Sequence, residues 1–162
     1  MTLAAIQPDL AALRADIMRH FPLQPVPPRD QIVSHDCEEC WRVRGDFAWT
    51  IWTDVPPETI DYHSDSLPLF TPVAHHYYLP AYLLRTLQPE GDKWGTVVDF
   101  VIYDLCPDHA DWWSSRFEVF SADQMRVVAS WLVFVLEHPE AFDGDDVVGR
   151  RGLEQYWKNH VA

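Results

Sequence analysis

Residues 34–40, with the sequence Ser-His-Asp-Cys-Glu-Glu-Cys, form the densest group of side chains in this chain that could carry chemistry. Cys37 and Cys40 lie three positions apart, and His35 stands next to them. Cysteines at this spacing can share a metal ion, form a disulfide, or lie side by side on one helix face. Each alternative implies a different function, and the local sequence leaves all three open.

A zinc site is one hypothesis for this motif. Zinc prefers four cysteine or histidine ligands, and Cys37 and Cys40 would supply two of them. Cys106 and His109 have the Cys-x-x-His form and would complete a set of three cysteines and one histidine, although the two pairs are far apart in the sequence. His35 is a further candidate donor. No cofactor other than zinc is expected.

Redox chemistry and packing are the other interpretations of the two cysteines. The helix dipole stabilises a thiolate at a helix N-terminus, but the acids Asp36, Glu38 and Glu39 oppose that effect. In the packing interpretation, Cys37 and Cys40 are small hydrophobic groups on one side of a capped helix. Packing is the interpretation that we favour.

The rest of the chain shows no catalytic motif. It contains no phosphate-binding glycine loop, no G-x-S-x-G sequence and no H-E-x-x-H sequence. His75 and His76 could line a pocket, but a core helix with amphipathic rings explains them more simply. We therefore expect a protein without catalytic activity.

The elements that would position these residues are predicted to be mostly helices. Asp36 has N-cap chemistry and Glu39 completes a capping-box pattern, so a helix is expected to follow and to end near Gly45. Phe117 to Phe120 are expected to be extended. Residues 97–105 fit a helix, with a strand as the alternative because of their β-branched content. Apolar spacing and start signals predict further helices at about 8–20, 57–63, 121–137 and a last segment around 153–157.

The segment from Val73 to Leu87 is predicted to be the central helix. Thr71 is a suitable N-cap, and Pro72 suits the first helical position. The segment is apolar on most sides, which is typical of a buried helix. Pro80 lies inside it and cannot donate a hydrogen bond to the carbonyl of His76, so a kink or break is expected there.

Composition predicts a single domain of the mainly α class. The chain has 162 residues, of which 48% are hydrophobic and 23% charged, as in an ordinary globular domain. We expect one compact helical domain over residues 1–162, with a central Pro-kinked helix and at most short strands.

The strong negative charge limits the partners. A net charge of −13 repels nucleic acid and anionic lipid, so a basic protein is the natural partner. The densest acidic run is expected to lie in an exposed loop and is the candidate partner-binding surface: Glu137, Glu140, Asp143, Asp145 and Asp146.

The chain carries no sign of export or membrane insertion. Residues 1–8 have neither a basic stretch nor a following apolar core. The longest apolar run, residues 131–136, is far shorter than the ~20 residues that span a bilayer. The cysteines are few and odd in number, unlike those of a secreted disulfide scaffold. We expect a cytoplasmic protein.

Two motifs resemble a bacterial family, domain of unknown function 6714. They are the His-x-Cys-x-Glu-Cys sequence that starts at His35 and the Tyr-Leu-Pro-Ala-Tyr-Leu sequence that starts at Tyr78. The resemblance covers about residues 30–136 and implies no known activity. It implies that the two motifs belong together as one feature, and the pattern does not include Cys106 and His109.

The expected function is therefore binding. Small acidic bacterial domains without catalytic motifs often neutralise basic toxins, and this analogy suggests an immunity-like role. The alternative is a zinc-binding protein built on the His-x-Cys-x-x-Cys motif. The oligomeric state is not predicted.

Overall fold

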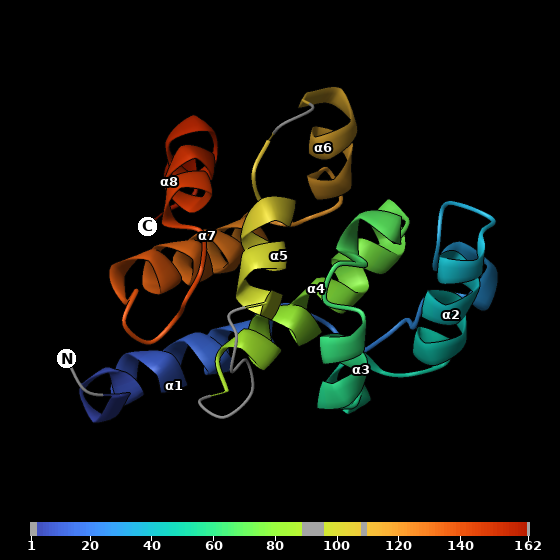
Figure 1. Cartoon of the computed structure of the whole chain (residues 1–162), viewed down its shortest axis with the longest axis horizontal. Coiled ribbons are helices and arrows are strands. Elements are labelled where there is room, and N and C mark those ends of the chain that lie inside the picture. The colour runs from blue at the N-terminus through green and yellow to red at the C-terminus, as the bar shows by residue number, and fades with distance from the viewer. Residues whose placement is uncertain (1–2, 89–95, 108–109, 162) are drawn as a thin grey trace.

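The computed structural model describes residues 3–88, 96–107 and 110–161, and this part of the chain is mainly helical (Figure 1). The helices are α1 (Leu3–His20), α2 (Glu38–Phe47), α3 (Pro57–Tyr62), α4 (Pro72–Thr86), α5 (Thr96–Asp104), α6 (Ala110–Phe117), α7 (Ala122–Glu137) and α8 (Asp146–Gln155). Short 3-10 turns are η1 (Arg29–Gln31), η2 (Trp52–Asp54), η3 (Leu67–Leu69) and η4 (Trp157–Asn159). The described residues contain no sheet, only an isolated bridge between Val33 and Phe70. The predicted mainly α class is confirmed.

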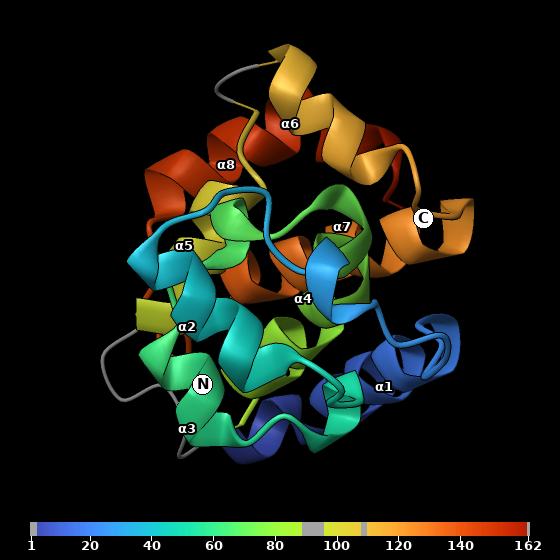
Figure 2. The same cartoon turned by 90° about the vertical axis from the view of Figure 1, so that its right-hand side faces the viewer.

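Helix α4 lies at the centre of the molecule, as its apolar sequence predicts (Figures 1 and 2). It packs against α1, α3, α5 and α6. The Thr71 hydroxyl accepts a hydrogen bond from the Ala74 amide at 3.1 Å, so the predicted cap is present. The helix continues through Pro80 rather than breaking there. Leu79 and Leu83 are fully buried, whereas Leu84 is only partly buried.

Helix α7 packs on α1 and α8. Ser121 and Gln124 form a full capping box at its start. The Gln124 side chain also donates to the carbonyl of His20, at the end of α1. One side chain therefore caps α7 and ties it to the C-terminal end of α1.

Several predicted local structures are wrong. Cys37, not Asp36, is the N-cap of α2, and its sulfur accepts from the amide of Cys40. Asp36 instead accepts a hydrogen bond from the indole of Trp41. Helix α2 ends at Phe47, which is fully buried, close to the predicted end near Gly45.

One confirmation and one correction concern the second half of the chain. The helix predicted at residues 97–105 is present as α5, so the alternative strand does not form. Phe117 is not extended but is the last residue of α6, where it packs against Trp113 and Trp157. In both places, burial between helices overrides the β-branched and aromatic propensity for strands.

Candidate functional site

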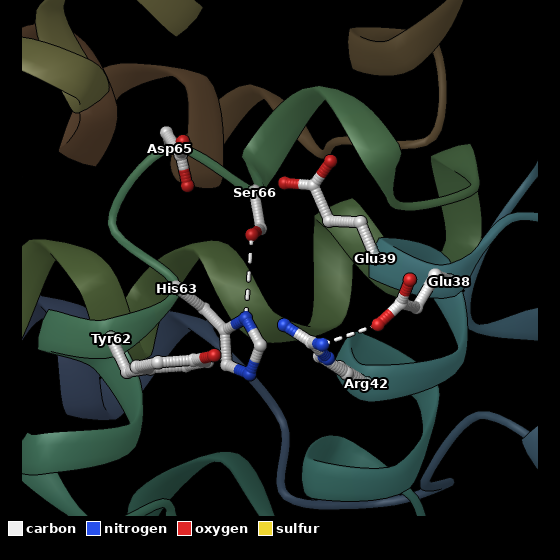
Figure 3. Close-up of a pocket in the computed structure, with 7 residues that line it drawn as sticks. All are labelled: Glu38, Glu39, Arg42, Tyr62, His63, Asp65 and Ser66. Atoms are coloured by element: carbon white, nitrogen blue, oxygen red, sulfur yellow. Dashed lines mark hydrogen bonds and ion pairs between the residues drawn. The ribbon is translucent and has the colours of Figure 1, made fainter.

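A pocket of about 520 Å³ opens between α2 and the end of α3. Figure 3 shows residues of α2 facing the end of α3 and the loop after it across this pocket. We call it the α2–α3 pocket. Its lining is polar and consists of Glu38, Glu39, Arg42, Tyr62, His63, Asp65 and Ser66. Two of these residues, Glu38 and Glu39, come from the motif that the sequence singles out.

The α2–α3 pocket carries an excess of negative charge. Glu38 pairs with Arg42 one helical turn further on, and a hydrogen bond to Tyr62, together with the charge of Glu38, raises the pKa of Arg42. Glu39 and Asp65 are exposed, and neither has a hydrogen-bond or ion-pair partner in the described part of the chain. The pocket therefore offers two carboxylates that are free to bind a ligand.

His63 forms the inner wall of the pocket. Its Nε2 lies 2.7 Å from Oδ2 of Asp46, and its Nδ1 lies 3.4 Å from the hydroxyl of Ser66. A serine, histidine and aspartate in this order resemble a hydrolytic triad. However, Ser66 is only 1% exposed, and its amide bonds back to the carbonyl of His63. The contacts therefore fix the imidazole in a local turn rather than present a nucleophile to a substrate.

The two motif cysteines have different surroundings. All three cysteines of the chain are free, so the disulfide alternative is not realised. Cys37 is exposed and its sulfur lies 3.4 Å from the amide of Cys40, whereas Cys40 is fully buried. Burial, followed by the contact with Cys37, raises the pKa of the Cys40 thiol. Cys40 thus packs as a hydrophobic group while Cys37 caps a helix.

The proposed ligands of a zinc site are not brought together where the structure describes them. Cys106 follows α5, and its sulfur accepts hydrogen bonds from Arg151 of α8. His109 lies outside the described residues. Within the described ranges, no group of three or more His, Cys, Asp or Glu side chains is placed to hold a metal ion. His35 is therefore not part of such a group either.

Two residues of the C-terminal acidic run make contacts at the start of helix α8. Asp145 is the N-cap of α8 and accepts from the amide of Val148 and from the hydroxyl of Tyr103. Asp146 pairs with Arg150. The remaining acids are exposed and have no partner among the described residues: Glu137, Glu140 and Asp143.

A buried polar network inside the core was not predicted from the sequence. Nε2 of His75 lies 2.7 Å from one oxygen of Asp104, and Arg116 donates to the other oxygen at 2.7 Å. These residues come from α4, α5 and α6, and all three are buried. Their spacing in the sequence gives no signal, because only the packing of the three helices places them together.

The comparisons with known proteins identify one family. A family model described as "Family of unknown function (DUF6714)" matches residues 33–161. Neither a curated protein nor a solved structure matches. A search of the described helices finds none that is long and apolar enough to cross a membrane.

Proposed function

The chain belongs to this family of unknown function, which brings no activity with it, and we propose that the protein binds a cationic group of a partner protein in the α2–α3 pocket. One observation carries the proposal. Glu39 and Asp65 face the same pocket of about 520 Å³, and both lack a partner among the described residues. Their carboxylates can accept hydrogen bonds from a lysine or arginine side chain.

The charge and shape of the pocket favour a cation over other ligands. Three carboxylates line it, against the single guanidinium of Arg42, which Glu38 already engages. The ring of Tyr62 is largely exposed and offers a face to which a cation is attracted. The net charge of −13 adds a long-range attraction that speeds the encounter with a basic protein.

The biological role that fits this chemistry is neutralisation of a basic protein. A small acidic protein that covers a cationic surface of a toxin would block it without chemistry of its own. We therefore propose an immunity-like, non-catalytic role in the cytoplasm. The exposed acids Glu137, Glu140 and Asp143 are a second candidate region of the partner-binding surface.

The test is capture of the partner with matched charge variants. The wild-type chain, a Glu39→Gln/Asp65→Asn variant and an Asp9→Asn/Glu118→Gln variant, whose two acids are exposed and lie outside both candidate regions, are immobilised as baits in a lysate of the native host. Each of the two variants removes two negative charges, so they differ only in where the charge is lost. We expect a basic protein on the wild type and on the second variant, and much less of it on the first.

Binding kinetics at two salt concentrations complete the test. Loss of buried ion contacts raises the dissociation rate, whereas loss of distant charge lowers the association rate mainly at low salt. We expect the pocket variant to dissociate at least about tenfold faster. If the two variants bind the captured protein equally well, the pocket is not the binding site.

A further inference from the structure

A second pocket lies between α5 and α6 and shares no lining residue with the α2–α3 pocket. Its volume is about 190 Å³. We call it the aromatic pocket, because rings form most of its wall. Its lining consists of Pro68, Phe100, Tyr103, Asp104, Cys106, Trp112, Trp113 and Arg116. The rings of Phe100, Tyr103 and Trp112 are partly exposed although they are large and apolar.

Arg116 lines this pocket and carries a hydrogen-bond donor without a partner among the described residues. Its Nη1 donates to Asp104 at 2.7 Å, and its Nη2 donates to the carbonyl of Leu67 at 2.6 Å. Its Nε is buried and has no hydrogen-bond partner among the described residues. A buried donor that stays unpaired is unfavourable, so this atom is a natural place for an acceptor on a ligand.

The charge around Arg116 is already balanced. Asp104 contacts the guanidinium directly. Burial lowers the pKa of His75, the other group that contacts Asp104, so the imidazole is neutral near pH 7. His76, on the same helix, hydrogen-bonds to Gln124 instead. The network of Arg116, Asp104 and His75 has no net charge, and a ligand therefore needs an acceptor atom but no charge of its own.

We propose that the aromatic pocket binds a small, neutral, planar aromatic molecule whose carbonyl oxygen accepts a hydrogen bond from Nε of Arg116. The rings of Phe100, Tyr103 and Trp112 provide edges and faces for such a ring. The size agrees with this class, since a cavity of about 150 Å³ holds benzene. The additional volume accommodates one small polar substituent. Aromatic amides and nucleobases are the chemical class that combines these features.

The test uses benzamide, the smallest molecule with both features. Binding to the full chain is followed by NMR through the indole N–H signals of Trp112 and Trp113, which are assigned with single Trp→Phe variants. Trp113 already donates to the carbonyl of Asp104, so its signal also reports on the polar network. We expect saturable shifts of these two signals, with the indole of Trp41, on α2, unchanged.

Three related probes separate the contributions of ring, acceptor and charge. Cyclohexanecarboxamide keeps the acceptor but lacks the ring, and we expect it to bind up to about tenfold more weakly than benzamide. Benzoate adds a charge that the balanced network disfavours, so we also expect weaker binding. p-Cresol imitates a tyrosine side chain of a partner protein. If p-cresol or benzoate binds more tightly than benzamide, the proposed ligand class is wrong.

Two variants distinguish a loss of the binding site from a general loss of folding. Trp112→Ala removes an exposed ring of the pocket, and Trp41→Ala removes an exposed tryptophan elsewhere. We expect the first to weaken benzamide binding several-fold and the second to leave it unchanged, with both chains still folded. Equal binding by both variants, or no saturable shifts in the wild type, would overturn the proposal.

Discussion

At the scale of single residues, burial and mutual contact determine the charge states of His75, Asp104 and Arg116. Burial would raise the pKa of Asp104, but the charge of Arg116 and the contact with His75 outweigh it and lower that pKa. A buried carboxylate of this kind needs its partners, and removal of one partner is costly. Asp104 is therefore ionised, Arg116 is charged, and His75 donates from a neutral ring.

The lowered pKa of His75 predicts a loss of stability in mild acid. The unfolded chain takes up a proton on this residue near pH 6.5, whereas the buried ring resists protonation. The stabilisation is therefore complete above about pH 6.5 and is lost as the pH falls towards the lower folded value. We expect the free energy of unfolding to fall between pH 7.5 and pH 5.5, by at most about 1.4 kcal/mol per pH unit from this group.

Urea unfolding at several pH values measures this effect. His75→Asn should flatten the pH dependence even if the variant is less stable overall. A His75→Asn variant with the wild-type slope would contradict the assignment of a neutral, buried imidazole.

The three thiols should differ in reactivity. Cys37 is exposed, whereas Cys40 and Cys106 are buried, and burial raises the pKa of Cys40. A thiol reagent at pH 8 should therefore modify one cysteine quickly and the other two only after unfolding. Mass spectrometry of the labelled peptides identifies the site. If zinc binds the motif instead, Cys37 will be protected until a chelator is added.

At the scale of elements, helix α2 contains a glycine in its last turn. The sequence places the end of this helix near Gly45, and α2 ends at Phe47. A Cβ atom built at Gly45 meets no atom within 4 Å. Glycine inside a helix is less favourable than alanine, mainly because the unfolded glycine chain has more freedom to lose.

Gly45→Ala should therefore stabilise the protein. We expect an increase of about 0.5–1 kcal/mol in the free energy of unfolding. Gly149→Ala is the matched comparison on α8, because there a Cβ would come within 2.7 Å of Leu136. That variant should gain less or lose stability. Chemical denaturation of the two variants decides the point, and destabilisation by Gly45→Ala would show that α2 ends earlier than described.

At the scale of the whole molecule, one hydrophobic cluster joins all parts of the described chain. It includes Ile6 of α1, Tyr78 of α4 and Trp157 near the C-terminus. Because the cluster is continuous, no part of it can open without exposing apolar surface of the others. We infer that the described part of the chain forms one folding unit.

This inference predicts a single cooperative transition. Far-UV circular dichroism follows the helices, and tryptophan fluorescence follows the core, where Trp52, Trp131 and Trp157 are buried. The two signals should give the same urea midpoint and the same slope. Separate midpoints would indicate two independently stable units.

The sequence by itself determined the helical class, the central position of α4 and its Thr71 cap. The cap depends on a contact between residues a few positions apart, Thr71 with Ala74. Local hydrogen bonds and apolar spacing act before the tertiary fold forms, so the sequence reports them directly.

Only the tertiary structure decided where the candidate sites lie. Asp46 meets His63 and His75 meets Asp104 because segments on different elements pack together in the fold. Glu39 of the motif at residues 35–40 lines the α2–α3 pocket, which the sequence did not predict, and the Cys37 sulfur caps a helix where Asp36 was expected to do so. Long-range contacts of this kind depend on the packing of whole helices, which no local spacing encodes.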